Sequence, residues 1–369
     1  MSATSGVYRT KNASNHIMMI RPAKFGMNVE TAIDNFYQDQ NSAIDVVTQQ
    51  ELALKEFSVF VQVLLDHGIK VHVLPDTLEP ETPDAIFPNN WVSLHSSGHI
   101  LYYPMKAENR RWERRADLPA ILSEWGFRVD PQLIEDHSHH ENGSNLSSSG
   151  EGLFLEGTGS LIFDHDAKIA YCARSPRASA HLVGHIVSPL GYRPVVFSAF
   201  LSVPGDTGAG NGGSNSSDRM PIYHTNVMMT MTDRYAVVCL AAIDDPAERD
   251  AVCTAITESG KEILEITEAQ KHQFAGNMLL VKGSGGPSIS SRVGDGDGDG
   301  GVEGEARARG EDKLYLVMSA SAHAALTAEN IAFITSHGHE ILSVPIPTIE
   351  RLGGGSARCM MAEIYLERS

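Results

Sequence analysis

Apolar and polar positions repeat along this chain in one order: an amphipathic stretch, a glycine, and then a short apolar run. The pattern recurs five times, as LLDHGIKVHVL, LSEWGFRVDPQL, VSPLGYRPVVF, ITESGKEILEI and ITSHGHEILSV. The amphipathic stretch predicts a helix, the glycine predicts its C-cap, and the β-branched run predicts a strand. The five glycines are Gly68, Gly126, Gly191, Gly260 and Gly338.

Further apolar runs precede each predicted helix. Opening strands are expected in IMMIRP, DAIFPNNWVSLH, LFLEGTGSLIF, IYHTNVMMTM and FAGNMLLVKG, and second strands in HILYYPM, KIAYCAR, YAVVCLAA and KLYLVMSA. A strand-strand-helix-strand unit cannot bury its own apolar face, so we expect five units to stack around a common axis. The sequence thus predicts an α/β fold, a five-bladed pseudo-fivefold α/β propeller, as a single domain over residues 1–369.

Three stretches rich in Gly, Ser and Asp interrupt this rhythm, and their composition cannot supply a core. We expect disordered surface insertions at residues 137–150, 205–219 and 283–312. The DGDGDG of the third lacks the glutamate that closes an EF-hand loop. His137, His139 and His140 stand in a polar loop with no partner cluster, so we predict no metal site there.

Charge and composition narrow the function. The 369 residues include 29 Lys and Arg against 46 Asp and Glu, a net charge of -17, which disfavours binding to nucleic acid or anionic lipid. No apolar run approaches the roughly 20 residues that cross a bilayer, and the N-terminal residues lack the apolar core of a secretory signal. We therefore expect no membrane partner and a cytoplasmic protein. The pattern leaves a homo-oligomer open.

Cofactor chemistry is not indicated either. The four cysteines are far apart with no CxxC pair, which argues against a zinc ribbon and a redox dithiol. The glycine-rich GDTGAGNGG lies in a polar insertion without a following helix, unlike a phosphate-binding loop. We expect no cofactor.

Polar residues occur in the predicted opening strands, where apolar residues should face the axis. If the five openings are equivalent, these side chains meet at one end of the axis. Cys359, in GGGSARCMM, would add a nucleophile to a base and a carboxylate there. The polar residues are Asn89, Asn90, Glu156, His224, Asn226 and Asn277.

These motifs resemble those of a known superfamily. PDAIFPNNW, the LEG of Glu156, the H-x-N of His224 and GGGSARC match, in order, the motifs of the guanidine-group-modifying (pentein) superfamily of arginine deiminase, dimethylarginine dimethylaminohydrolase and amidinotransferases. FPNNW and YHTNVM look closest to its citrulline-utilisation hydrolases. The resemblance implies a five-bladed α/β propeller and a Cys-His-Glu site.

The resemblance also implies roles. Cys359 would attack the central carbon of a guanidino or ureido group, and His224 would protonate the leaving amine and then activate water. Glu156 would hold the substrate nitrogens and favour the charged imidazole. Arg358 is a candidate for the positive charge that generates thiolate, and Gly354 and Gly355 would let the backbone pass close to the substrate.

Two asparagines depart from the deiminase pattern. The residues matching Asn90 and Asn226 are aspartates in deiminases, where they clamp a cationic guanidinium. An amide offers both an acceptor and donors, so it complements a ureido group better. We therefore expect citrulline to be converted to ornithine, ammonia and carbon dioxide. Succinylarginine dihydrolase also carries asparagine at the first site, so an arginine-type dihydrolase stays open, with a deiminase as a further alternative.

The expected carboxylate-binding arginines are Arg110, in AENRRWERR, and Arg174, in YCARSPR, with Arg111 or Arg177 as alternatives. ENRRWERRADL also fits an exposed charged helix.

Asp84, Phe87 and Asn89 share the motif of Asn90. Asp84 and Phe87 also fit structural roles, as a turn-starting aspartate and a core aromatic.

Two rival functions stay in view. An amidinotransferase would pass the amidino group to an amine rather than to water, which depends on water access and cannot be inferred from sequence. A non-catalytic propeller binding protein, like the translation factor that shares this fold, would need no nucleophile, base or carboxylate at the axis. The presence of Cys359, His224 and Glu156 counts against it.

Overall fold

The computed structural model describes residues 10–39, 43–143, 146–147, 150–201, 220–284 and 312–369. The strands are β1 (His16–Arg21), β2 (Lys70–Pro75), β3 (Val92–Leu94), β4 (Ile100–Tyr102), β5 (Ile134–Asp136), β6 (Ile162–Asp164), β7 (Ile169–Arg174), β8 (Arg193–Ser198), β9 (Met229–Met231), β10 (Tyr235–Val238), β11 (Glu262–Glu265), β12 (Leu279–Ser284), β13 (Asp312–Ser319), β14 (His339–Val344) and β15 (Ala362–Glu363).

The α-helices are α1 (Val46–Asp66), α2 (Glu108–Arg111), α3 (Leu118–Glu124), α4 (Gly157–Ser160), α5 (Ala180–Val187), α6 (Pro246–Glu258), α7 (Glu268–His272), α8 (Ala320–Ala325), α9 (Ala328–Ser336) and α10 (Pro347–Gly353). Short 3-10 turns include η1 (Pro88–Asn90), η3 (Ser138–Asn142), η5 (Thr225–Val227) and η7 (Ala357–Met360).

The described strands form five three-stranded sheets, in the orders β15-β1-β2, β3-β4-β5, β6-β7-β8, β9-β10-β11 and β12-β13-β14. In each sheet the middle strand pairs antiparallel with one neighbour and parallel with the other. At least one helix lies between the two parallel strands. The predicted strand-strand-helix-strand unit is therefore present, and the fold is mixed α/β. No sheet closes on itself within the described part of the chain.

The first unit departs from the prediction. IMMIRP was expected to be an opening strand, but β1 is the middle strand of its sheet. Its antiparallel partner is β15 from the other end of the chain, with Ile17 opposite Glu363 and Met18 opposite Ala362. The segment that carries Cys359 is thus the missing opening of the first unit.

The predicted helix ends are confirmed. All five repeat glycines have φ between 74° and 82°, a left-handed conformation that glycine adopts without a Cβ clash. Each lies between a helix and the strand that follows, so the chain reverses there and returns to its own sheet.

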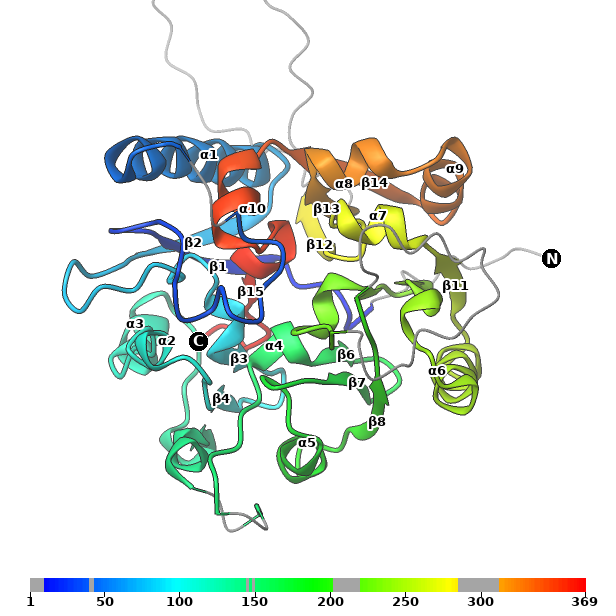
Figure 1. Cartoon of the computed structure of the whole chain (residues 1–369), viewed down its shortest axis with the longest axis horizontal. Helices are drawn as coiled ribbons and strands as arrows, with labels where there is room; N and C mark the ends of the chain where they lie inside the picture. The colour runs from blue at the N-terminus through cyan, green and yellow to red at the C-terminus, as the bar shows by residue number, and fades with distance from the viewer. Residues whose placement is uncertain (1–9, 40–42, 144–145, 148–149, 202–219, 285–311) are drawn as a thin grey trace, which may run out of the picture.

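The sheets contact one another in sequence. An isolated bridge joins Leu94, the last residue of β3, to Ile364, next to β15, and another joins Ser14 to Val281 of β12. β9 lies against both β6 and β12, and α4 contacts β3. Figure 1 shows the sheets distributed around α4 and the C-terminal segment, with α1, α3, α5, α6 and α9 toward the outside.

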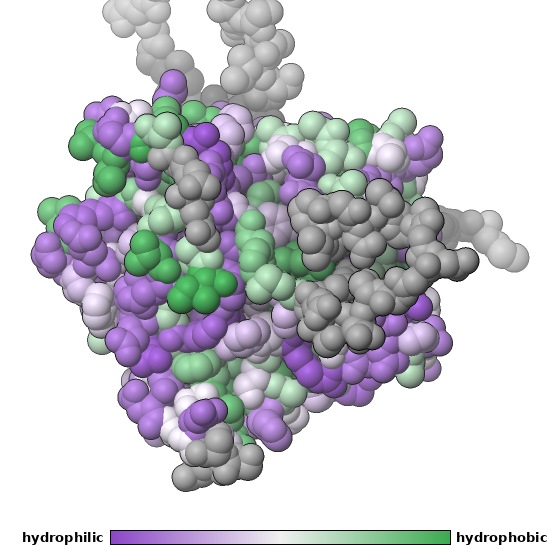
Figure 2. All heavy atoms as spheres, in the orientation of Figure 1, coloured by the Kyte–Doolittle hydropathy of each residue, from purple (hydrophilic) through white to green (hydrophobic). Residues whose placement is uncertain are grey.

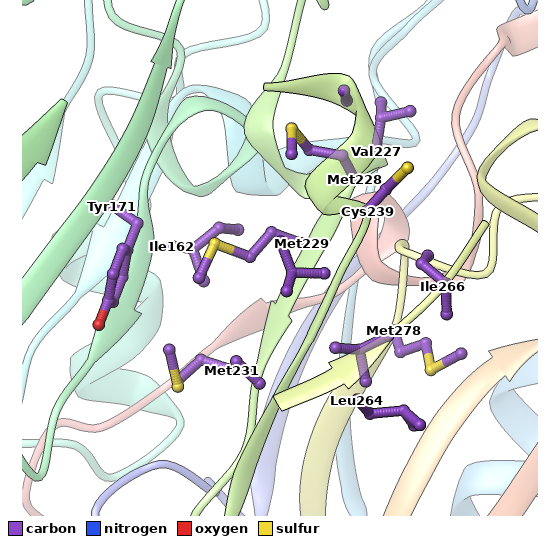
Figure 3. Packing of buried hydrophobic residues seen from close by; sticks show 14 of the residues in the cluster. Ile162, Tyr171, Val227, Met228, Met229, Met231, Cys239, Leu264, Ile266 and Met278 are labelled. Carbon is purple, nitrogen blue, oxygen red and sulfur yellow. The ribbon is translucent and has the colours of Figure 1, made fainter. Parts of the chain in front are cut away.

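Apolar side chains fill the spaces between sheets. Met229 and Met231 project from β9 toward Ile162 of β6 and Tyr171 of β7, as Figure 3 shows, and all four are buried. Methionine is unbranched and adapts to irregular gaps, so it suits an irregular seam between two sheets.

The predicted insertions have different outcomes. Residues 205–219 lie outside the described residues, as do 285–311 of the third insertion. Residues 137–143 do not fit the prediction of a disordered insertion, because η3 packs against the protein there. Glu141 is buried and forms ion pairs with Arg111 and Arg114, which anchor the segment. No helix in the described ranges is long and apolar enough to cross a membrane.

Candidate active site

Short helical turns bring the polar residues of the opening segments together. One residue separates each of η1, α4, η5 and η7 from the strand that follows. α4 contacts η1 and η5, and η1 contacts η7. The sequence placed Asn90 and Asn226 within strands, whereas they lie in these turns. A strand would send alternate side chains to opposite faces, and a turn relaxes that constraint.

Glu156 and His224 form a buried hydrogen-bonded pair. His224 Nε2 lies 2.8 Å from Glu156 Oε2, and the backbone N–H of Lys106 donates to Glu156 Oε1 at 3.1 Å. Because Nε2 faces the carboxylate, its proton is donated there. Nδ1 is then the ring nitrogen left for proton transfer.

The charges around this pair fix its protonation. Burial opposes the charge on Glu156, but Arg177, the hydrogen bond from His224 and Arg110 outweigh it and lower the pKa of Glu156 to about 2. Burial lowers the pKa of His224 below its usual value of 6.5, and Glu156 offsets this only in part. At neutral pH the pair is therefore a carboxylate and a neutral imidazole.

Cys359 lies in η7, and only 4% of its surface is exposed. The side-chain N–H groups of Asn226 and Asn277 each donate to its Sγ at 3.3 Å. Hydrogen-bond donors aimed at sulfur stabilise negative charge on it. Two neutral amides therefore support the thiol as a nucleophile.

Arg358 was expected to supply that support, but its side chain points elsewhere. Its guanidinium donates to the carbonyl of Met361 at 2.9 Å and to Glu363 at 3.0 Å. It lines a different cavity, together with Asn12 and His165. The structure does not bring the Arg358 side chain to the thiol.

Asn277 is a residue whose role the sequence did not assign. Its Nδ2 also donates to the carbonyl of Asn226 at 2.9 Å, and its Oδ1 accepts from the backbone N–H of Arg358 at 3.0 Å. One amide thus holds both flanks of the nucleophile. The signal was present, because Asn277 stands in AGNMLL at the position of Asn226 in HTNVMM.

Asn90 lies beside the Glu156–His224 pair. Its Oδ1 accepts from Arg110 Nη1 at 2.8 Å. A Cβ on Gly159 would fall 2.3 Å from Asn90 Nδ2 and 2.9 Å from His224 Nδ1, so only glycine fits there. Asn90 Nδ2 and Asn226 Oδ1 are buried and have no hydrogen-bond partner among the described residues. One amide donor and one amide acceptor are thus unused at the site.

Arg110 lines the pocket, as predicted, and is completely engaged by protein groups. Its Nε and Nη2 each donate to the Glu113 carboxylate at 2.9 Å. Nη2 also lies 3.3 Å from the carbonyl of Phe87.

The second predicted arginine is replaced by its alternative. Arg174 is the last residue of β7, and its exposed side chain pairs with Glu248 of α6, away from the pocket. A bridge between Ser175 and Ala178 turns the chain back, and Arg177 then enters the pocket. Arg111, the other alternative, pairs with Glu141.

The remaining predicted residues are buried, and most line the pocket. Asp84 accepts from Asn28 at 2.8 Å through Oδ2, while its Oδ1 has no partner within the described part of the chain. A Cβ on Gly355 would fall 2.9 Å from the Phe87 ring, so glycine is required beside that ring. Gly354 has φ of 64°, and its carbonyl accepts from Tyr223 at 2.6 Å.

These residues line a small, partly open cavity of about 10 Å³. Asn89 and Asn226 are buried but are not part of its lining. The lining residues are Asn35, Asp84, Phe87, Asn90, Arg110, Arg177, Tyr223, His224, Gly353, Gly354, Gly355 and Cys359.

The histidines of η3 lie near one another, with ring centroids of His139 and His140 4.0 Å apart. Across the described ranges, no group of three or more His, Cys, Asp or Glu side chains is arranged to hold a metal ion.

Comparison with known proteins identifies a family. The model of the family described as N,N dimethylarginine dimethylhydrolase, eukaryotic, matches residues 21–295 and 303–366. No curated protein matches the chain.

Several solved structures share the fold. The N-terminal domain of ArgZ with bound product, an arginine dihydrolase from the ornithine-ammonia cycle in cyanobacteria, has a TM-score of 0.61 at 16% identity, covering 95% of this chain and 99% of that domain. The complex of AgrE with ornithine and NAD+ has a TM-score of 0.62 at 13% sequence identity, covering 96% of this chain but 40% of the AgrE chain.

A histidine variant of dimethylarginine dimethylaminohydrolase, as an adduct with S-methyl-L-thiocitrulline, gives a TM-score of 0.54 at 13% identity, covering 95% of this chain and 99% of that one. At such identities the likeness shows the fold. The family match, which spans most of the sequence, shows more: the chain belongs to the eukaryotic N,N dimethylarginine dimethylhydrolase family of the guanidine-group-modifying superfamily, and it is a hydrolase of non-peptide C–N bonds.

Proposed function

We propose that this protein hydrolyses a ureido amino acid, with citrulline converted to ornithine, ammonia and carbon dioxide. The observation that carries the proposal is the pair of unused amide atoms, Asn90 Nδ2 and Asn226 Oδ1. A ureido group has a carbonyl that accepts a hydrogen bond and N–H groups that donate, so its chemistry complements both atoms, of which Asn90 lines the cavity and Asn226 lies outside the lining. A guanidinium only donates and would leave Asn90 Nδ2 unsatisfied.

In the first step Cys359 Sγ attacks the ureido carbon, and an S–C bond forms. Neutral His224 takes the thiol proton on Nδ1 and passes it to the departing nitrogen, so the C–N bond breaks and ammonia leaves. Glu156 stabilises the imidazolium between these transfers. The product is a thiocarbamate that joins Cys359 to the nitrogen of the amino acid side chain.

In the second step His224, neutral again, removes a proton from water as the water adds to the same carbon. The S–C bond breaks, and His224 returns the proton to the sulfur, which restores the thiol. The released carbamate loses carbon dioxide and leaves the free amine. One water is consumed for each ammonia and each carbon dioxide formed.

We include in this proposal the closed five-bladed arrangement, which the chain of contacts between neighbouring sheets supports. An axis through α4 and η7 would explain why residues from distant units, such as Asn90 and Asn277, meet around one thiol.

The test is ammonia release with mass spectrometric identification of products from citrulline, arginine and dimethylarginine, each offered separately. Ornithine from citrulline but not from arginine supports the proposal. Ornithine from arginine would make the enzyme a dihydrolase. Citrulline as the end product of arginine or dimethylarginine contradicts the argument from the amides.

A paired variant sharpens the result. Asn90→Asp with Asn226→Asp restores two carboxylates, which should move preference from ureido to guanidinium compounds by about tenfold or more in kcat/KM. Cys359→Ser is the inactive control. An unchanged preference in the double variant would show that these amides do not select the substrate.

A further inference from the structure

The segment between β1 and α1 lies over the pocket. Gln38 and Asn35 donate to the carbonyl of Gly353 at 3.1 and 3.3 Å, and Asp34 reaches Arg177. Figure 1 shows this dark-blue loop crossing the centre of the molecule beside α10. Its outer surface is apolar in places, as Figure 2 shows, and Ile33 is 77% exposed. One loop thus touches both the glycine turn and the pocket arginine.

Asp34 occupies the cationic end of the pocket. Arg177 donates to Asp34 Oδ1 through Nε at 2.9 Å and also through Nη2. Lys106 Nζ donates to Asp34 Oδ2 at 2.6 Å. The side chain of Arg177 is 3% exposed and that of Asp34 15%. Two cations therefore already hold one carboxylate, which belongs to the protein itself.

The carboxylate that pairs with Arg110 is held in the fold in a different way. Glu113 lies three residues from Arg110, immediately beyond α2, and is buried with it. Separating that pair would disrupt the local fold. Asp34 instead comes from a loop that meets the rest of the pocket through hydrogen bonds between groups distant in sequence. Asn35 and Gln38 donate to the carbonyls of the glycine turn, Asn28 and Thr31 donate to Asp84, and the Thr31 carbonyl accepts from Arg177. Of the two pocket arginines, Arg177 is the one that can exchange its carboxylate.

We propose that Asp34 is a specificity-determining residue: its carboxylate holds the place of the substrate carboxylate on Arg177 and Lys106, and only a substrate that carries a carboxylate displaces it. The inference rests on the proposed function and deepens it. A buried arginine without a partner is strongly unfavourable, so opening the loop alone is costly. Exchanging one carboxylate for another leaves Arg177 paired throughout.

Selection follows from this competition. A ureido or guanidino amine without a carboxylate has the reactive group but cannot replace Asp34, so the loop stays in place and Cys359 stays covered. Specificity then comes from an element that rejects the wrong compound as well as from contacts to the right one.

The principal variant is Asp34→Asn, which keeps the shape and removes the charge. The first measurement is the rate at which iodoacetamide alkylates Cys359, followed by peptide mass spectrometry. The second is the ratio of kcat/KM for citrulline to that for N-carbamoylputrescine, its analogue without a carboxylate. We expect alkylation to become about tenfold faster and the ratio to fall about tenfold.

Three further variants serve as controls for this experiment. Ile33→Ala alters an exposed neighbour and should change neither measurement. Lys106→Gln removes one of the two cations that hold Asp34 from a partly exposed position. It should raise alkylation in the same direction even if Asp34→Asn folds poorly. Asp34→Glu should restore part of the discrimination.

The two proposals fail in different ways. Alkylation needs no substrate, so a protein that turns over none of the tested compounds can still show the effect of Asp34. Unchanged alkylation and an unchanged ratio in folded Asp34→Asn would overturn the role of Asp34, and active wild-type enzyme would leave the proposed function standing. Equal effects from Ile33→Ala would also overturn it.

Discussion

The two walls of the pocket hold their polar groups in different ways. The amide wall consists of Asn90, which lines the cavity, and of Asn226 and Asn277, which do not line it but donate to Cys359 Sγ. It leaves one amide donor and one amide acceptor unused. The charged wall, formed by Arg110 and Arg177, is compensated throughout by protein carboxylates.

The difference indicates that the two walls of this small cavity have different roles. Neutral dipoles near the reacting carbon can stabilise the charge that develops on it during the reaction. They do not hold a permanent counter-ion there, which suits a group whose charge changes from step to step. In our proposals, the full charge of Arg177 at the other wall positions the part of the substrate that does not react. We therefore expect changes on the amide side to alter kcat and changes on the charged side to alter KM or stability.

The largest effect should come from the nucleophile. Cys359→Ser should lower turnover by at least about 10⁴-fold, because a serine hydroxyl is hardly ionised at neutral pH. The thermal unfolding midpoint should stay within a few degrees of wild type. Steady-state kinetics and a melting curve decide the matter.

Cys172→Ser is the matched control. Cys172 is completely buried in β7, so this variant should melt earlier and keep its activity per folded molecule. If both variants behaved alike, Cys359 would be a packing residue.

Substitutions at the charged wall should lower the stability of the protein. Arg110→Gln leaves Glu113 buried without its cation and should lower the free energy of unfolding by about 3 to 5 kcal/mol in denaturant titration. Arg110→Gln combined with Glu113→Gln removes both charges and should recover most of that loss. A double variant as unstable as the single one would show that Glu113 is not the reason.

Glu156 connects the two walls, and its removal should be visible in the pH profile. Glu156→Gln should lower kcat by about 10²- to 10³-fold, because the imidazolium formed during the reaction loses its carboxylate.

The acid limb of the profile of kcat/KM against pH gives the direction of the expected shift. Neutral His224 is the active form, so kcat/KM falls as pH drops through the His224 pKa, which lies below 6.5. Since Glu156 raises that pKa, the variant's limb should move to lower pH. A limb that moves upward would contradict the assigned role of His224.

Local pattern predicted the repeating units well, because each depends on neighbouring residues. Helix, C-cap glycine and strand follow directly in sequence, and all five glycines have positive φ. The partner of β1 could not be found this way. β15 is only two residues long, and its pairing links the two ends of the chain, which no local periodicity records.

The site was predictable where residues recur at equivalent positions and not where a turn intervenes. Asn90, His224 and Cys359 follow the repeat. Arg174 and Arg177 are three residues apart, and only the turn after β7 sends one to Glu248 and the other to the pocket. Asp34 lies in a loop without a motif, so only the folded chain reveals its contact.

The smallest expected effect comes from the backbone between the walls. In Gly159→Ala the new Cβ would fall 2.3 Å from Asn90 Nδ2 and 2.9 Å from His224 Nδ1, so Asn90 must move. Because a displaced amide misplaces the substrate, kcat/KM should fall about tenfold. Gly184→Ala is the control, since an added Cβ meets nothing within 4 Å there. If Gly159→Ala raised KM alone, Asn90 would belong with the charged wall, to which Arg110 already ties it.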